Sequence, residues 1–160
     1  MESKNLLESI RVAKENERKA ALFYANAAKS AGVQVGKQLF EQLSEFEEFH
    51  FARLTALEKT LEANGDFISY EGRGFPLPPE IVPKTVEEPN RQTIMEIIAQ
   101  ALELEKQAEK AYSDLAAQVS DPQGHEMFNR LCEEEHKHYR ILTEVYWNMT
   151  NFKVWKWPLP

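Results

Sequence analysis

The sequence predicts an all-α protein: one antiparallel four-helix bundle, built from two similar helical hairpins that a long crossover joins. Apolar residues recur every three or four positions in four long stretches, whereas strand signals are almost absent. Residues 10–54 also align without a gap on residues 98–142, and fourteen of the forty-five pairs are identical. Unrelated sequences would give about three identities, so the helical hairpin is duplicated.

The first hairpin is expected over residues 5–63. Its first helix spans about residues 5–31, and Asn5 with Glu8 has the spacing of a capping box. Its second helix spans about residues 35–62 and is ended by the Asn-Gly pair that follows. Both helices carry an apolar stripe on one face, which predicts that they pack against each other and against the second hairpin.

The second hairpin is expected over residues 93–150. Thr93 and Glu96 have the spacing of a capping box and predict that the third helix starts there. Asp121 followed by Pro122 predicts the start of the fourth helix, because proline is favoured at the first helical position.

The crossover, residues 64–92, is expected to run along the bundle. Its first 27 residues hold five prolines and three glycines and cannot be helical. A helix of about 28 residues is about 42 Å long, and a loop of this length can span about 90 Å. The third helix can therefore start at the end where the second started, and the whole chain, 1–160, is predicted to form a single domain.

The C-terminal tail, residues 151–160, follows an aromatic stretch, and the sequence "YWNMTNFKVWKWPLP" holds three tryptophans. We expect this segment to dock back on the bundle or to form a dimer interface. An exposed patch that binds a partner is the alternative.

Composition narrows the function classes. A net charge of −7 without a cluster of lysine and arginine argues against nucleic acid and against anionic membrane surfaces as partners. No stretch approaches the 18 to 20 or so apolar residues of a membrane span, and the N-terminus has no apolar signal region, so a cytoplasmic protein is expected. The single cysteine, Cys132, is expected to be an inert thiol, and any bound metal must use histidine and carboxylate ligands.

Polar residues interrupt the four apolar stripes at matching places. Measured from a turn near Val33, Glu17 lies 16 residues before it, and Glu47 and His50 lie 14 and 17 residues after it. At 1.5 Å per residue all three sit about 24 Å from the turn. The second hairpin repeats these spacings, which predicts that six side chains meet at one level: Glu17, Glu47, His50, Glu105, Glu135 and His138.

The repeat also resolves the ambiguous motif "EEEHKH". Only the pair Glu135 and His138 aligns with Glu47 and His50. The histidines off the stripe, His125 and His136, are expected at the surface. Solvated positions are likewise expected for the remaining glutamates near the stripes: Glu15, Glu41, Glu45, Glu48, Glu103, Glu133 and Glu134.

Four carboxylates and two imidazoles in a bundle core require compensating charge. Two carboxylates 4 Å apart repel by about 4 kcal/mol at an effective dielectric of 20. Two divalent cations would balance four negative charges, and a ligand set of nitrogen and oxygen suits iron or manganese, and also zinc. A glutamate from each of two helices plus Glu-x-x-His from each of the other two is the di-iron carboxylate arrangement.

The segments "ENERKAALFY", "EEFH", "ELEKQAEKAY" and "EEEHKH", in this order around a long crossover, resemble the ferritin-like superfamily and its rubrerythrin-type branch without the rubredoxin-like domain. The resemblance implies two iron ions per chain, with manganese, a mixed iron–manganese pair or zinc as substitutes. It implies that Glu47 and Glu135 bridge the metals. The resemblance also implies that Glu17 and Glu105 are terminal ligands and that His50 and His138 each bind one metal. Tyr24 and Tyr112 would orient the terminal glutamates.

By the same resemblance, the protein is expected to be an oxidoreductase that reduces O₂ or H₂O₂ at the metal pair, with no catalytic residue apart from the metal centre. Electrons would come from an external donor such as a rubredoxin-like protein, and a homodimer is expected. Rubrerythrins that reduce peroxide carry a further glutamate where this chain has Ala108. A non-enzymatic iron-binding or storage protein is the main alternative, and a helical adaptor that keeps the site for stability is a third.

Overall fold

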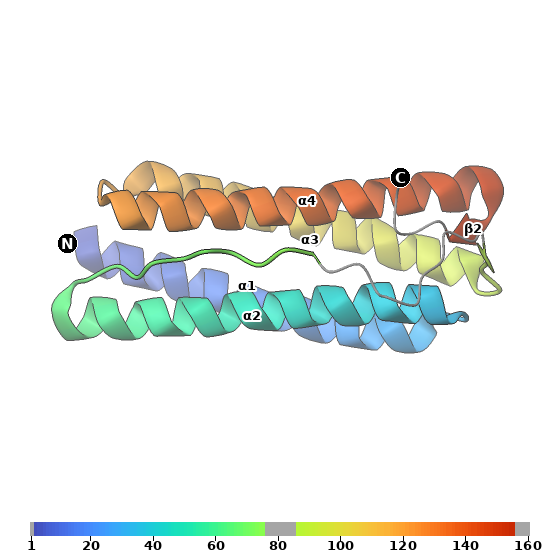
Figure 1. Ribbon diagram of the computed structural model, residues 1–160, viewed down its shortest axis with the longest axis horizontal. Coiled ribbons are helices and arrows are strands. Elements are labelled where there is room, and N and C mark those ends of the chain that lie inside the picture. Colours follow the sequence, from blue (N-terminus) through green and yellow to red (C-terminus); the bar gives the residue numbers. More distant parts are fainter. Residues whose placement is uncertain (1, 76–85, 156–160) are drawn as a thin grey trace.

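The computed structural model describes residues 2–75 and 86–155 and consists of four long helices (Figure 1). They are α1 (Glu2–Ser30), α2 (Gln34–Asn64), α3 (Arg91–Gln118) and α4 (Pro122–Phe152). Helix α1 packs mainly on α2, α3 packs mainly on α4, and α1 also contacts α3. The predicted all-α bundle of two antiparallel hairpins is confirmed. No helix in the described part of the chain is long and apolar enough to cross a membrane.

Two helix ends follow the predicted signals. The Asp121 carboxylate accepts hydrogen bonds from the backbone N–H groups of Gln123 and Gly124, at 2.9 and 3.2 Å, and caps α4. Helix α2 is capped by Gly65, whose φ of 78° is readily adopted only by glycine and whose N–H donates to the Leu61 carbonyl oxygen.

The predicted capping box of Thr93 and Glu96 is wrong, because α3 begins two residues earlier, at Arg91. The residue before the helix is Asn90, and its side chain donates to the Ser30 carbonyl oxygen at 3.1 Å. The Asn90 side chain therefore contacts the end of α1 instead of capping α3.

The capping box predicted from Asn5 and Glu8 is also wrong. Helix α1 already begins at Glu2, so Asn5 lies within the helix.

The described part of the crossover runs along the bundle, as predicted. Residues 66–75, called the strap below, extend from the end of α2 along the bundle (Figure 1). Contacts on both sides place the strap between α2 and α4, since Arg53 donates to the Ser69 carbonyl oxygen and Arg130 donates to that of Tyr70. Past residues 76–85, Glu88 accepts a 2.7 Å hydrogen bond from the Gly32 N–H, which puts the start of α3 beside the α1–α2 turn.

A two-residue ladder, which the sequence pattern did not predict, closes this end of the bundle. Strand β1 (Val86–Glu87) pairs antiparallel with β2 (Val154–Trp155). The pairing brings the C-terminal segment onto the bundle, so docking of the tail is confirmed for Trp155, which is fully buried. The predicted tail starts too early, because α4 continues to Phe152. Trp157 lies outside the described residues.

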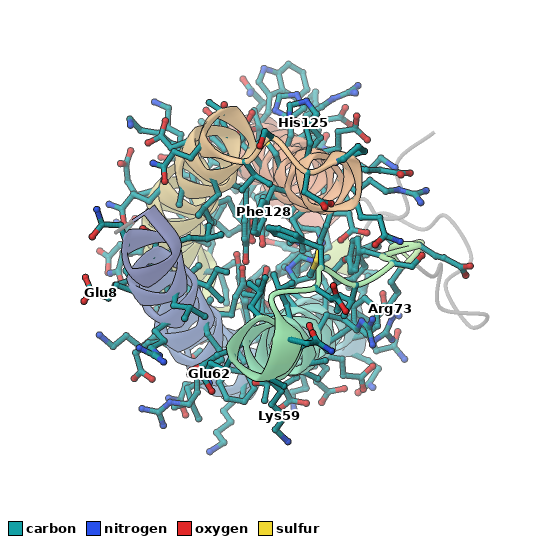
Figure 2. The ribbon with its side chains drawn as sticks, turned by 90° about the vertical axis from the view of Figure 1, so that its left-hand side faces the viewer. Glu8, Lys59, Glu62, Arg73, His125 and Phe128 are labelled. Atoms are coloured by element: carbon teal, nitrogen blue, oxygen red, sulfur yellow. The ribbon has the colours of Figure 1, made fainter. Side chains whose placement is uncertain are left out.

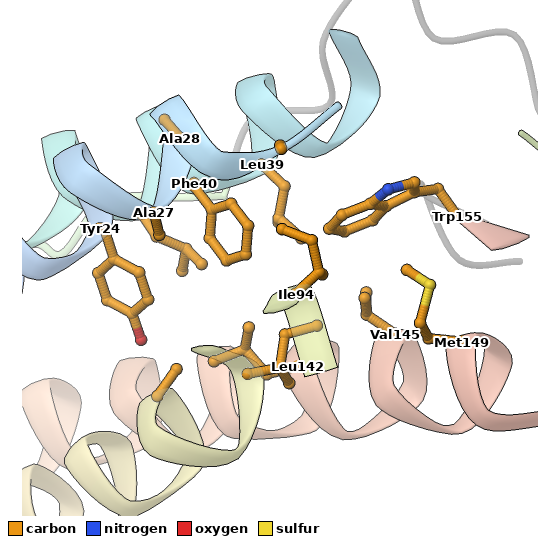
Figure 3. Packing of buried hydrophobic residues seen from close by; sticks show 14 residues of the cluster. Tyr24, Ala27, Ala28, Leu39, Phe40, Ile94, Leu142, Val145, Met149 and Trp155 are labelled. Carbon is orange, nitrogen blue, oxygen red and sulfur yellow. The ribbon is translucent and has the colours of Figure 1, made fainter. Parts of the chain in front are cut away.

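Trp155 enters the core near Leu39 and Met149 (Figure 3), and it lies beside Gly36. Its ring meets the Phe40 ring edge to face at 5.9 Å. A Cβ atom at Gly36 would lie 2.6 Å from the Trp155 ring, so only glycine fits there. Gly124, at the repeat-related position, likewise makes room for Phe67 of the strap, because a Cβ atom at Gly124 would lie 2.5 Å from the Phe67 ring.

The apolar core is divided into two blocks, one toward each end of the bundle. The first surrounds Tyr24, Phe40 and Trp155, and the second surrounds Ile10, Tyr112 and Phe128. Viewed along the bundle, Phe128 lies among the helices, whereas Glu8 and Lys59 lie on the outside (Figure 2). The level between the two blocks is polar, and it is where the predicted ligands fall.

Candidate metal centre

The six predicted ligand side chains converge in this middle layer, and none is more than 3% exposed. They form two overlapping groups whose ligand atoms lie within 4.8 Å of one another. The first group is Glu17, Glu47, His50 and Glu135, and the second is Glu47, Glu105, Glu135 and His138. Glu47 and Glu135 belong to both groups, so their carboxylates stand between two potential metal positions.

His50 directs its Nδ1 atom into the layer. This atom lies 2.9 Å from Oε1 of Glu135, 3.4 Å from Oε2 of Glu47 and 3.5 Å from Oε2 of Glu17. One imidazole nitrogen therefore faces both shared carboxylates and the glutamate of its own group.

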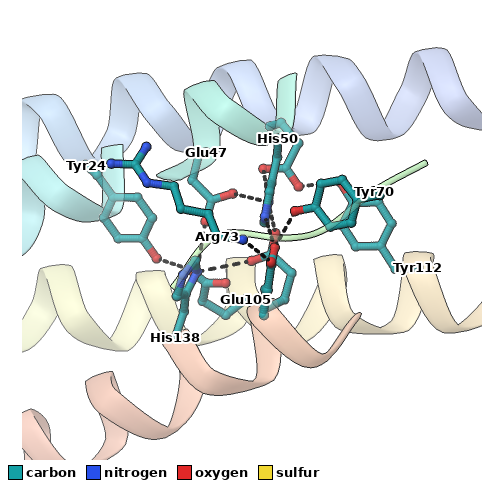
Figure 4. Close-up of polar contacts among 11 residues, drawn as sticks. Tyr24, Glu47, His50, Tyr70, Arg73, Glu105, Tyr112 and His138 are labelled. Atoms are coloured by element: carbon teal, nitrogen blue, oxygen red, sulfur yellow. Dashed lines mark hydrogen bonds and ion pairs between the residues drawn. The ribbon is translucent and has the colours of Figure 1, made fainter. Parts of the chain in front are cut away.

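His138 does the same on the other side (Figure 4). Its Nδ1 atom lies 3.2 Å from Oε1 of Glu47, 3.5 Å from Oε2 of Glu135 and 3.6 Å from Oε1 of Glu105. The two halves of the layer are thus related by the approximate two-fold symmetry of the duplicated hairpins.

Two tyrosines hold the unshared glutamates from the opposite hairpin. Tyr24 donates to Oε1 of Glu105 and Tyr112 donates to Oε1 of Glu17, each over 2.5 Å. All four side chains are buried. The sequence pattern singled out these tyrosines, and the structure shows that each acts across the bundle on the other repeat.

Without a metal ion, the layer cannot keep all its carboxylates charged. Burial and the charge of Glu17 raise the pKa of Glu47 to about 8, and burial with the neighbouring carboxylates raises that of Glu135. Burial would also raise the pKa of Glu17, but a hydrogen bond with Glu47 and the charge of His50 lower it to about 2. Although burial opposes it, the nearby carboxylates raise the pKa of His50 and of His138.

The free ligand atoms fit a cation. Within the described residues, several buried carboxylate oxygens of the layer have no hydrogen-bond donor: Oε2 of Glu17, Oε1 of Glu47, Oε2 of Glu105 and Oε2 of Glu135. Buried oxygens without a donor are costly. Carboxylates and imidazoles of this number and arrangement are the donors that a pair of divalent metals uses, so the residues present could hold metal.

Glu134 departs from the expectation that it is solvated. Its side chain is buried, and its Oε2 atom lies 2.6 Å from Nε2 of His50. Tyr70 donates to the same oxygen over 2.5 Å, and the backbone N–H of Arg73 donates to Oε1 over 2.9 Å. The strap therefore covers the α2–α4 side of the layer and brings Glu134 into contact with a predicted ligand. Five of the other six glutamates in the solvated set are exposed, and Glu15 is half-buried.

A cavity of about 70 Å³ reaches the layer from the opposite side, between α1 and α3. The exposed Asn16 and Gln107 lie at its outer part, and the half-buried Ala20 and Ala108 line its wall. Ala108 is the position at which peroxide-reducing rubrerythrins would carry another carboxylate. Here the cavity occupies that place.

The residues expected to be uninvolved lie away from the layer. His125 and His136 are exposed, and His136 pairs with Glu109 at 3.0 Å. Cys132 is partly buried and its thiol lies 3.3 Å from the Glu109 carbonyl oxygen. Burial raises the pKa of this thiol, which disfavours the reactive thiolate.

An antiparallel four-helix bundle with a buried layer of four glutamates and two histidines defines a ferritin-like protein with a potential metal site. Comparison with known proteins makes the assignment more specific. The family model for rubrerythrin matches residues 8–146, and the chain belongs to this family. The chain is also similar in fold to a solved structure of a hypothetical protein from Pyrococcus furiosus, with 24% sequence identity, a TM-score of 0.73 and 92% of each chain covered. No curated protein matches the chain.

Proposed function

We propose that the protein binds two iron ions per chain in the middle layer and is an oxidoreductase that reduces O₂ or H₂O₂. The observation that supports it best is the pair of overlapping ligand groups that share Glu47 and Glu135. A shared carboxylate suits a pair of cations rather than a single one, and four carboxylates balance the charge of two divalent ions.

In this proposal each metal would be held by one unshared glutamate, one histidine and the two shared glutamates. The unshared ligands are Glu17 and His50 for one position and Glu105 and His138 for the other. Tyr24 and Tyr112 fix the orientation of the unshared glutamates through their hydrogen bonds. Iron at these positions would supply electrons and would stabilise negative charge on a reacting oxygen.

The cavity supports a small oxidant. Its volume of about 70 Å³ suits a molecule of the size of O₂ or H₂O₂, since one water occupies about 30 Å³ in the liquid. Its lining includes Glu17, Glu105 and both shared glutamates, so a molecule in the cavity would reach the metal positions directly. The strap covers the opposite side, which leaves the α1–α3 side for entry.

The electron donor and the assembly are also part of the proposal. The chain has a single cysteine and therefore no pair of Cys-x-x-Cys motifs for a rubredoxin-like iron site. We accordingly propose an external donor, such as a rubredoxin-like protein, and a homodimer.

Ala108 favours a second candidate. A rubrerythrin without the additional glutamate resembles the peroxide-reducing members less closely, and the same site could bind, buffer or store iron without turnover. Size measurement in solution separates the two readings, because a large cage of subunits favours storage and a small dimer favours the oxidoreductase.

The first test is the metal content of the protein purified without added metal, with its optical spectrum before and after anaerobic reduction. We expect about two irons per chain and a near-ultraviolet absorption that bleaches on reduction and returns with O₂ or H₂O₂. The oxidant that acts faster identifies the substrate. Glu47→Gln should lose metal, whereas the exposed Glu48→Gln should retain it. A chain that takes up no transition metal on reconstitution and is equally stable with a chelator would contradict the proposal.

A further inference from the structure

The two metal positions have matching ligands, but their histidines differ on the side that faces away from the layer. His50 has its Nε2 atom 2.6 Å from Oε2 of Glu134. In the described part of the chain, Nε2 of His138 has no hydrogen-bond partner, although it is buried. The difference lies outside the set of six predicted ligands.

The repeat identifies what replaces the carboxylate. Position 134 aligns with position 46 under the shift of 88 residues, and position 46 is a phenylalanine. The Phe46 ring meets the His138 ring edge to face, with centroids 4.5 Å apart. Phe75 also packs on His138, at 5.7 Å. Phe46 packs on His50 as well, at 5.2 Å, so both imidazoles contact aromatic rings and the His50 imidazole also faces a carboxylate.

The strap holds Glu134 in place. Tyr70 and the backbone N–H of Arg73 use both of its oxygens. Between them lies Gly72, with a φ of 79° that is readily adopted only by glycine, and a Cβ atom there would lie 2.6 Å from Oε1 of Glu134. The close approach of the backbone thus requires this glycine, and the carboxylate has little freedom to turn away from His50.

The other ligands of the two positions and the tyrosines that hold them are alike. Each unshared glutamate accepts a 2.5 Å hydrogen bond from a tyrosine of the other hairpin, and Glu47 and Glu135 serve both positions. Any difference between the positions is therefore expected to come mainly from Glu134 and Phe46.

A carboxylate behind a metal-bound imidazole has a known physical effect. It accepts the proton on the far nitrogen, fixes the tautomer that presents Nδ1 to the metal, and makes the imidazole a better electron donor. Loss of such a partner costs about 10- to 100-fold in metal affinity. An imidazole without a carboxylate partner receives none of this support.

We propose that Glu134, held by Tyr70 and Arg73, is a positioning residue for His50 and makes the two metal positions inequivalent, so that the Glu17–His50 position fills first. The Glu105–His138 position then holds the second and more readily exchanged metal. This inference rests on the proposed two-metal site.

The test is an anaerobic titration of the metal-free protein with Co²⁺, followed by its visible absorption and by competition with a chelator. The unmodified protein should bind two ions in two steps whose affinities differ by about tenfold or more. Glu134→Gln should weaken the first step by about 10- to 100-fold, and Tyr70→Phe should weaken it less. Glu133→Gln is the matched control, because Glu133 is the exposed neighbour in the same helix.

A second measurement assigns the tight position. In the Zn²⁺-loaded protein with ¹⁵N-labelled histidine, the His50 Nε2–H should be protected from exchange and shifted by its carboxylate partner, and Glu134→Gln should remove both effects. His138→Ala should abolish the weak step and keep the tight one. Circular dichroism and thermal unfolding confirm that each variant is folded.

The outcomes separate the inference from the proposed function. Two bound ions with equal affinities, or two steps that Glu134→Gln leaves unchanged, overturn the inference alone. A tight step that disappears in His138→Ala and persists in His50→Ala reverses the assignment and also overturns it. If the unmodified protein binds no ion, the proposed two-metal site fails as well.

Discussion

Tyr24 and Glu105 are 81 residues apart in the sequence, and in the folded chain the tyrosine hydroxyl donates a 2.5 Å hydrogen bond to Oε1 of the glutamate. Tyr112 and Glu17 repeat the contact in the opposite direction. Each hairpin thus fixes a glutamate of the other, which couples the packing of the bundle to the geometry of the middle layer.

Removing either hydroxyl should destabilise the protein. Tyr24→Phe leaves a buried oxygen of Glu105 without its donor, and the expected loss is about 1 to 3 kcal/mol in the free energy of unfolding. Tyr112→Phe should cost a similar amount through Glu17. Chemical denaturation of the metal-free proteins measures both. Tyr139→Phe, at a half-buried position of α4 outside the layer, is the control. An unchanged denaturation midpoint in the Tyr24 and Tyr112 variants would contradict the role.

The metal-free protein should lose stability as the pH rises. The pKa of Glu47 is about 8 in the folded chain, against an ordinary value of 4.5. Between these values the folded state binds more protons than the unfolded state, so the free energy of unfolding falls with pH, by about 1.4 kcal/mol per pH unit for each such proton. The raised pKa values of Glu135, His50 and His138 act in the same direction.

Glu17, with its pKa of about 2, adds stability that is complete above pH 4.5 and is lost only in acid, so it does not alter this trend. Thermal unfolding in the presence of a chelator, from pH 5 to 8, measures the slope. Glu47→Gln should flatten it, because glutamine carries no titrating proton. A melting temperature that rises with pH would rule out the protonated layer.

Closing the cavity should slow the reaction with an oxidant without removing metal. Ala108→Leu places three further carbon atoms in a space of about 70 Å³ between α1 and α3. We expect at least a tenfold slower return of the oxidised spectrum with O₂ or H₂O₂, about 1.4 kcal/mol in the barrier, with unchanged iron content. Ala99→Leu, at an exposed position of the same helix, is the control. Equal rates in both variants would place the entry route elsewhere.

Gly36→Ala should weaken the docking of the C-terminal segment. The new methyl group would lie 2.6 Å from the Trp155 ring, and overpacking of this kind costs about 1 to 3 kcal/mol. Trp155→Ala should cost about 3 to 5 kcal/mol by leaving a cavity. Gly74→Ala is the control, because a Cβ atom there meets nothing within 4 Å. Equal denaturation midpoints for the Gly36 and Gly74 variants would contradict the packing.

Much of the fold and the six side chains of the layer follow from the sequence, because an internal repeat and helical spacing constrain them together. The helix starts were less predictable. Asn90 lies before α3, but its side chain donates a hydrogen bond to the Ser30 carbonyl oxygen instead of capping the helix. No local pattern indicates this contact. The pairing of Val86 with Trp155 likewise depends on how the chain returns to the bundle.

Glu134 was missed because the repeat was used to choose among neighbouring glutamates. Its partner position holds Phe46, so the rule that selected Glu135 set Glu134 aside. A usable signal was nevertheless present. Position 134 lies three residues after Leu131 and four before His138, and an apolar residue at the repeat-related position marks it as buried. Its partners Tyr70 and Arg73 belong to the strap, which has no counterpart in the repeat.

The covalent link between the hairpins has a consequence for symmetry. Two copies of one hairpin, related by an exact two-fold axis, could present the same glutamates, histidines and reciprocal tyrosines. They could not place a glutamate behind one histidine and a phenylalanine behind the other. Joining the halves in one chain allows the surroundings of Glu134 and Phe46 to diverge while the shared ligands stay alike.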